Sequence, residues 1–242
     1  MAKARHALRV TLLQIRSHRE AEEQEYLCFL ERCRLRAEQL TAINLVDRPG
    51  VRWADVESAD ALIIGGAGGH SATEEHAFTA RLGELVARWI ADDRPLFGSC
   101  WGHQFMAAEL GGSVVTDTAQ EEIGSFPIEL TAQGRRDPLF ATFPERFTVQ
   151  LGHHDRIEEL PPGFVVLARS ERCAHQAIRL DGKPVYGSQF HSEMTTEHMR
   201  ARLLMYRDEY LPPGADPAEI ERLLEPSPEV EGLLDRFLTL YS

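Results

Sequence analysis

Short apolar runs alternate with helix-like segments through the first half of the chain, and this alternation constrains the fold more than any other feature of the sequence. The runs 8–15, 42–46, 61–64 and 95–98 have the length of buried strands. Between them, apolar residues recur every three or four positions, which predicts helices over 19–40, around 78–89 and from Cys100 to about Leu110. Strands that alternate with helices form parallel sheets through right-handed crossovers, so we expect a parallel sheet between two layers of helices.

Beyond residue 112 the pattern changes to short strand-like segments separated by turns. We expect these strands near 128–130, 147–151, 164–168, 177–180 and 185–190. A helix capped by Thr195 or Thr196 then extends to about residue 206.

The last part of the sequence has the pattern of a helical tail. The proline-rich stretch 211–217 predicts a linker, and Ser227 followed by Pro228 predicts the start of a final helix. The expected fold is therefore an α/β three-layer sandwich with a mostly parallel central sheet over residues 1–210. We expect residues 211–242 to form a helical C-terminal extension packed on the same domain.

Composition and charge narrow the function classes. The 242 residues are 43% hydrophobic, which is enough to bury a sizeable core. The 38 Asp and Glu outnumber the 26 Lys and Arg, and the net charge of −12 disfavours binding to nucleic acid or to anionic membranes. The sequence contains no run of roughly 18 apolar residues and no secretory leader pattern, so we expect a cytoplasmic protein.

Metal and disulfide chemistry have little support in the sequence. The four cysteines lack the spacing of a zinc ribbon or a disulfide framework: Cys28, Cys33, Cys100 and Cys173. His153, His154 and Asp155 lie together, but adjacent ligands without a third cluster are weak evidence for a metal, and exposed loop histidines are the simpler interpretation. We therefore expect no metal and no cofactor.

The segment around Cys100 has the form of a nucleophile elbow. Gly98-Ser99-Cys100-Trp101-Gly102 follows an apolar strand and opens a helix, and small residues on either side relieve crowding at such a sharp turn. A thiol at a helix N-terminus is favoured as the thiolate by the helix dipole and by unpaired backbone donors. The alternative is an ordinary buried thiol, an interpretation that suits the other three cysteines.

A base for this thiol occurs later in the chain. His191 and Glu193 are two positions apart at the end of an expected strand, where residues i and i+2 share a face. Glu193 can then accept one ring N–H of His191 and leave the other nitrogen to take the proton of Cys100. The alternative is a surface ion pair of little consequence. A zinc deaminase also carries H-x-E, but it requires a later C-x-x-C, and no cysteine follows Cys173.

Taken together, these motifs resemble the class I, triad-type glutamine amidotransferases, especially stand-alone proteins similar to the amidotransferase domain of GMP synthase. The resemblance extends from about residue 60 to residue 193. Its motifs, in order, are D-A-L-I-I-G-G at 60–66, G-S-C-W-G-H-Q at 98–104, L-G-G at 110–112, E-I-G at 122–124, H-x-D at 153–155 and Q-F-H-S-E at 189–193.

The resemblance implies hydrolysis of a glutamine side-chain amide through a γ-glutamyl thioester. It assigns Cys100 as nucleophile, His191 as general base and Glu193 as the carboxylate that orients the base. The remaining assignments are oxyanion donors in the backbone of Trp101 and of Gly66 or Ala67, and substrate contacts from Gln104, His153 and His154. The alternative for Gln104 is that it only packs within its helix and does not contact the substrate.

Several positions depart from the common family pattern and bear on the substrate. Ala67 stands where proline is usual, Trp101 replaces a leucine or tyrosine after the nucleophile, and Ser192 replaces a proline between base and carboxylate. His154 takes the place of a glycine at a point where some relatives present backbone to the substrate.

Three functions follow as hypotheses. The first is a glutaminase or amidotransferase that releases ammonia for an unknown acceptor, with any synthase on another chain, because no phosphate-binding G-x-x-x-x-G-K-[ST] motif is present. The second is a γ-glutamyl peptidase that acts alone on glutathione-like substrates. The third is a non-catalytic binding or regulatory protein. The presence of Cys100, His191 and Glu193 argues against it, because a binding role would not require these three groups together. The oligomeric state stays open.

Overall fold

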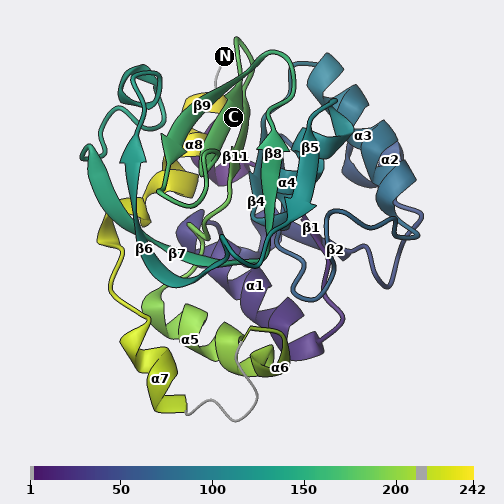
Figure 1. The fold of residues 1–242 in the computed structure, drawn as a ribbon. Helices are drawn as coiled ribbons and strands as arrows, with labels where there is room; N and C mark the ends of the chain where they lie inside the picture. Colours follow the sequence, from purple (N-terminus) through teal and green to yellow (C-terminus); the bar gives the residue numbers. More distant parts are fainter. Residues whose placement is uncertain (1–2, 211–216) are drawn as a thin grey trace.

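A computed structural model describes residues 3–210 and 217–242 of the chain (Figure 1). In chain order its strands are β1 (Val10–Gln14), β2 (Leu40–Asn44), β3 (Ala61–Ile64), β4 (Leu96–Ser99), β5 (Ser113–Thr116), β6 (Glu122–Leu130), β7 (Arg146–His153), β8 (Asp155–Glu159), β9 (Phe164–Arg169), β10 (Ala177–Leu180) and β11 (Val185–Ser188). Its α-helices are α1 (Arg19–Arg32), α2 (Trp53–Val56), α3 (Thr79–Ala91), α4 (Trp101–Glu109), α5 (Thr196–Met205), α6 (Arg207–Tyr210), α7 (Pro217–Arg222) and α8 (Leu233–Tyr241). Short 3₁₀ helices occur at η1 (Arg5–Ala7), η2 (Ala37–Gln39), η3 (Gly134–Arg136) and η4 (Pro228–Val230).

One large sheet organises the molecule, with strand order β2-β1-β3-β4-β11-β10-β9-β6-β7. The five strands from β2 to β11 run parallel, and the pairs from β11 onward to β7 are antiparallel. β5 and β8 form a separate antiparallel pair. The parallel half, with its crossover helices, confirms the predicted α/β fold with a mostly parallel central sheet.

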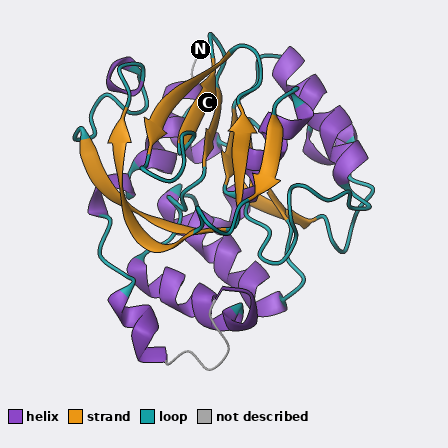
Figure 2. Ribbon diagram, viewed as in Figure 1, coloured by secondary structure: helices purple, strands orange, loops and turns teal. Residues whose placement is uncertain are grey.

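Side chains alternate between the two faces of the sheet and define two separate cores. In β3, Ile63 packs in a core that also contains α1 and α8, whereas Leu62 and Ile64 pack in a core that contains α3 and α4. This period of two places a helical layer on each side of a continuously buried sheet. Figure 2 shows helices to the right of the strands, where Figure 1 labels α2 and α3, and helices below them, where Figure 1 labels α1 and α5. A third, smaller core joins α1, α5 and α7.

The first helix is shorter than the periodicity predicts. α1 ends at Arg32 rather than near residue 40, because Arg34 adopts a positive φ of 49° and the Leu35 N–H bonds back to the Leu30 carbonyl at 3.0 Å. This is a Schellman ending, in which a left-handed residue stops the helix. Glycine is the usual residue at such a position and would have predicted the end of the helix. Because Arg34 stands there instead, nothing in the sequence indicates that the helix ends.

Two other expectations differ from the structure. The strands β5 and β8 were not predicted, because Ser113–Thr116 is only partly buried and β8 ends in charged residues. The final helix begins later than expected, since η4 covers Pro228–Val230 and Gly232 caps α8. The predicted linker lies mostly outside the described residues, and α7 follows it without having been predicted.

The tail contributes a core helix. Phe237 of α8 is fully buried, with its ring centroid 5.4 Å from that of Phe97 in β4 and 5.9 Å from that of Tyr186 in β11. The last helix therefore packs directly beneath the two strands that lead to the functional site. Within residues 3–210 and 217–242, no helix is both long and apolar enough to cross a membrane.

This packing predicts that Phe237→Ala strongly destabilises the protein. Removing a buried phenylalanine costs about 3–5 kcal/mol of unfolding free energy. Leu240→Ala is the matched control, since Leu240 lies on the same helix and is 43% exposed, and it should cost less than about 0.5 kcal/mol. Urea denaturation measures both, and equal effects of the two substitutions would contradict the core role of α8.

Candidate active site

Cys100 occupies a strained turn between β4 and α4. Its backbone has φ 50° and ψ −101°, a conformation that a residue with a side chain rarely adopts, and it is the N-cap residue of α4. The flanking glycines make room for this turn. A Cβ on Gly98 would lie 2.6 Å from the Gly102 backbone, and a Cβ on Gly102 would lie 2.4 Å from the Ile64 carbonyl oxygen. The elbow predicted from these glycines is therefore present.

Strand pairing brings the distant His191 segment to this turn. β4 and β11 run parallel with Ser99 opposite Ser188, and the Cys100 N–H donates to the Ser188 carbonyl at 2.8 Å. The carboxyl ends of parallel strands lie at the same edge of a sheet, so the chain that leaves β11 arrives beside Cys100. Residues almost a hundred positions apart thus meet through backbone hydrogen bonds.

His191 and Glu193 form a buried pair behind the thiol. His191 Nδ1 lies 2.7 Å from Glu193 Oε1, and the other carboxylate oxygen accepts a hydrogen bond from Ser99 Oγ at 2.9 Å. The contact matches the prediction, but its origin differs. β11 ends at Ser188, and the two residues lie in a turn rather than on one face of a strand.

The charges of this pair shift both pKa values. Burial alone lowers the pKa of His191, but the charges of Glu193 and Cys100 outweigh it and raise the pKa from 6.5 to about 10. Burial alone raises the pKa of Glu193, but the interaction with His191 outweighs it and holds that pKa below its usual range. The arrangement stabilises an imidazolium next to a carboxylate at neutral pH.

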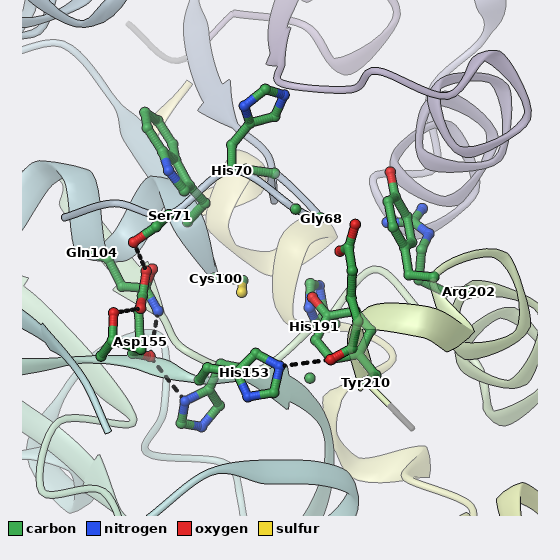
Figure 3. Close-up of a pocket in the computed structure, with 18 of the residues that line it drawn as sticks. Gly68, His70, Ser71, Cys100, Gln104, His153, Asp155, His191, Arg202 and Tyr210 are labelled. Carbon is green, nitrogen blue, oxygen red and sulfur yellow. Dashed lines mark hydrogen bonds between the residues drawn. The ribbon is translucent and has the colours of Figure 1, made fainter. Parts of the chain in front are cut away.

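A cavity of about 580 Å³ opens over the thiol. Figure 3 shows Cys100 near its centre, with Gln104 and Asp155 on one side and His191, Tyr210 and Arg202 on the other. The sequence-predicted residues that line it are Ala67, Cys100, Trp101, Gln104, His153, His154 and His191. Glu193 and Gly66 lie behind this wall rather than in it.

The glycine-rich loop after β3 supplies part of the wall. The Gly66 N–H donates to Glu25 Oε1 at 3.1 Å, so this amide is already engaged, whereas Ala67 lines the cavity. Of the two loop residues expected to donate to the oxyanion, only Ala67 lines the cavity. Gly68 has φ +59°, and its Cβ would lie 2.5 Å from the Tyr206 ring, which explains why glycine is needed there.

Gln104 faces the cavity with its amide hydrogens already used. Its Nε2 donates to the Asp155 carbonyl at 2.7 Å and to Gln189 Oε1 at 3.0 Å. Because an amide nitrogen carries two hydrogens, a ligand would meet the Gln104 oxygen. Gln189 in turn donates to Cys100 Sγ at 3.6 Å, so the amide network reaches the thiol.

The two adjacent histidines differ in their surroundings. His153 is buried in β7, and its ring nitrogens contact the Asp155 carbonyl at 2.9 Å and Glu122 Oε2 at 3.1 Å. The expectation of an exposed loop residue is therefore wrong for His153, because the strand that carries it is covered. His154 is half-buried, contacts Glu121 Oε2 at 2.7 Å and stacks on Tyr210.

Sequence reasoning missed a buried ion pair that supports the glycine-rich loop. Arg16, just after β1, donates to Glu25 of α1 at 2.5 Å, and both side chains are almost wholly buried. Gln14 and Gly66 also donate to Glu25. In the sequence, Glu25 resembles the other charged positions of an amphipathic helix, so nothing marks it as buried. The one indication of a buried ion pair is Arg16, a charged residue at the carboxyl end of a buried strand.

The His191 pKa predicts a pH-dependent contribution to stability. A pKa that is raised on folding stabilises the fold fully below about pH 6.5, and this contribution is lost as the pH rises through about 10. The difference in unfolding free energy between the wild type and His191→Gln should therefore shrink across this interval. Urea denaturation at several pH values within it provides the measurement, and a constant difference would contradict the raised pKa.

The chain is similar in sequence to proteins of known family. The model of the family "Glutamine amidotransferase class-I" matches residues 32–207. One subunit of a glutamine-hydrolyzing GMP synthase from Methanopyrus kandleri is 32% identical over 151 residues, which are 62% of this chain and 73% of that protein. A glutamine-hydrolyzing GMP synthase from Thermosipho melanesiensis is 37% identical over 110 residues, but these are only 20% of its length.

Solved structures agree on the fold. A glutamine amidotransferase from Thermotoga maritima has a TM-score of 0.74 and 26% identity, and the match covers 96% of this chain and 97% of that one. A glutamine amido transferase from Methylobacillus flagellatus has the same TM-score of 0.74 at 21% identity, with 98% of this chain and 96% of that one covered. The match over residues 32–207, which contain the elbow and the His191 turn, shows that the chain belongs to the class I glutamine amidotransferase family.

Proposed function

We propose that the chain hydrolyses the side-chain amide of glutamine through a thioester on Cys100. The observation that supports this proposal is the pairing of β4 with β11, because it joins the strained Cys100 to the strand that leads to His191. Cys100 and His191 line the same cavity, and Glu193 contacts the His191 ring. In a non-catalytic binding protein, nothing would select for this strained cysteine next to a buried charged pair.

The chemistry follows from the positions of the groups. The Cys100 thiolate attacks the γ-carbonyl carbon, and His191 gives its proton to the departing nitrogen, so that ammonia leaves and a γ-glutamyl thioester remains. Water, deprotonated by His191, then attacks the thioester, releases glutamate and restores the thiol. Glu193 holds the imidazole ring in orientation and stabilises its cationic form.

Backbone amides are the proposed stabilisers of the tetrahedral oxyanion. The Trp101 N–H lies directly after the nucleophile at the start of α4, and the Ala67 N–H comes from the loop after β3. Preorganised donors of this kind act where charge develops in the transition state. We assign the amino-acid end of glutamine to the Gln104 side of the cavity, with His153 in the wall beside it. His154 is the proposed substrate contact in the wall towards Tyr210, on which it stacks.

The ammonia acceptor belongs to a partner that we infer from the relatives. The Methanopyrus kandleri relative is named as one subunit of its GMP synthase, which implies at least one further subunit in that protein. By analogy, a separate synthase chain would receive the ammonia released here. A γ-glutamyl peptidase is the second candidate function. It is favoured by two buried arginines, Arg16 and Arg202, that line the same cavity as His191.

The first test of this function is substitution of the nucleophile. Cys100→Ala should lower kcat/KM for glutamate release from L-glutamine by about 10³-fold or more, because no other group in the proposed mechanism forms the thioester. Cys173→Ala is the matched control, since Cys173 is also buried but lies outside the cavity, and it should stay within about tenfold of the wild type. Glutamate release that survives Cys100→Ala would contradict the proposal.

A further inference from the structure

Arg202 is a buried cation that the described part of the chain leaves without a carboxylate partner. It lies on α5, is 4% exposed and lines the cavity. Its guanidinium donates to two neutral oxygens, Gln24 Oε1 at 2.7 Å and the Ala21 carbonyl at 3.4 Å. Among the residues that the structure describes, no carboxylate lies within ion-pair distance of it. An unpaired buried charge is costly, so its presence in a cavity wall calls for a function.

Arg16 and Tyr206 extend this polar region. Both line the same cavity, and over residues 3–210 and 217–242 neither Arg16 Nε nor the buried Tyr206 hydroxyl has a hydrogen-bond partner. The pKa of Arg202 is lowered, first by its burial and then by repulsion from the positive charge of Arg16. Glu25 is the only carboxylate in the described structure that forms an ion pair with either of them.

Three acidic residues line the cavity, and one of them, Asp155 on the Gln104 side, already accepts hydrogen bonds from Ser71, Ala72 and Thr116. The other two are Glu209 and Glu74. Glu209 lies against the glycine-rich loop, where a Cβ on Gly69 would be 2.6 Å from its Oε1, and Glu74 lines the cavity from the segment before α3. Neither forms an ion pair with Arg16 or Arg202 in the part of the structure that is described. The Arg16, Arg202 and Tyr206 region therefore keeps one uncompensated positive charge and unused donors among the described residues.

This region lies on the leaving-group side of the proposed reaction. A Cβ on Gly66 would be 2.9 Å from an Arg16 guanidinium nitrogen and 3.2 Å from His191 Cε1, so Arg16 and His191 lie on either side of Gly66 and line the same cavity. Since His191 protonates the departing nitrogen, whatever is attached to that nitrogen extends towards Arg16. Arg202 lies beyond His191 on the side of Cys100 away from Gln104 (Figure 3).

We propose that Arg16, Arg202 and Tyr206 bind a carboxylate carried by the leaving amine, so that the preferred substrates are γ-glutamyl amides of amino acids or similar short carboxylated amines. The inference rests on the proposed function and deepens it. Hydrolysis breaks the same C–N bond, and the amino acid leaves in place of ammonia after taking its proton from His191. Glutamine is then the substrate with the smallest leaving group, and it leaves this region unfilled.

Binding of a matched pair of ligands tests the site without turnover. In the Cys100→Ala background, γ-glutamylglycine should bind about tenfold or more tightly than γ-glutamylglycinamide, which differs only in lacking the carboxylate charge. Isothermal titration calorimetry measures both affinities. Equal affinities would overturn the proposal.

Substitutions identify the residues responsible. Arg202→Met, added to the Cys100→Ala background, should reduce the affinity ratio to near one, whereas Arg202→Lys, which keeps the charge, should retain part of it. Arg200→Met is the matched control, because Arg200 is on the same helix, half-exposed and paired with Glu221, and it should leave the ratio unchanged. A preference that persists in folded Arg202→Met would show that other groups bind the carboxylate.

Turnover by the wild type separates this inference from the proposed function. Hydrolysis of both compounds at equal kcat/KM would leave the proposed function intact and refute the carboxylate site. A binding preference that Arg202→Met removes, without hydrolysis of either compound or of glutamine, would support the site and contradict the proposed function. Faster hydrolysis of γ-glutamylglycine supports both.

Discussion

The parallel pairing of β4 with β11 is the constraint on which the rest of the site depends. Its register sets Ser99 opposite Ser188 and lets the Cys100 amide bond to the Ser188 carbonyl. That single hydrogen bond fixes the strained turn to the strand that leads to His191. The core beneath the two strands holds the register, since Phe237 packs against a ring from each of them. The chemistry of the site thus rests on the packing of the last helix of the chain.

Buried ion pairs also support the site, but not every buried charge has a partner. The Arg16–Glu25 pair holds the glycine-rich loop through the Gly66 amide, and its cost of desolvation is offset because Arg16, Gln14 and Gly66 all donate to the one carboxylate. The His191–Glu193 pair is compensated in the same way, with Ser99 on the second oxygen. Arg202 has no such carboxylate within the described residues, which is why we assign it to a ligand rather than to the fold.

The sequence predicted the parts of the protein that depend on local pattern. Buried strands of continuous apolar residues, such as β3, and the glycines around Cys100 have one physical interpretation each, and both were predicted correctly. The His191–Glu193 contact was also predicted, although the turn that produces it was not. Local pattern failed where tertiary contacts decide the structure, as at the arginine that ends α1 in a left-handed conformation. The charges beside the site were missed for the same reason, because a buried Glu25 and an exposed glutamate look alike in a helical sequence.

The most direct test of the account is covalent labelling by a glutamine analogue that carries a chloroketone in place of the side-chain amide. The electrophile takes the position of the γ-carbonyl, so we expect one equivalent of label per chain, located on Cys100 by peptide mapping. L-Glutamine should protect against it. Label spread over the four cysteines, or reaction at Cys100 that glutamine does not slow, would contradict the claim that this elbow binds a γ-glutamyl carbonyl.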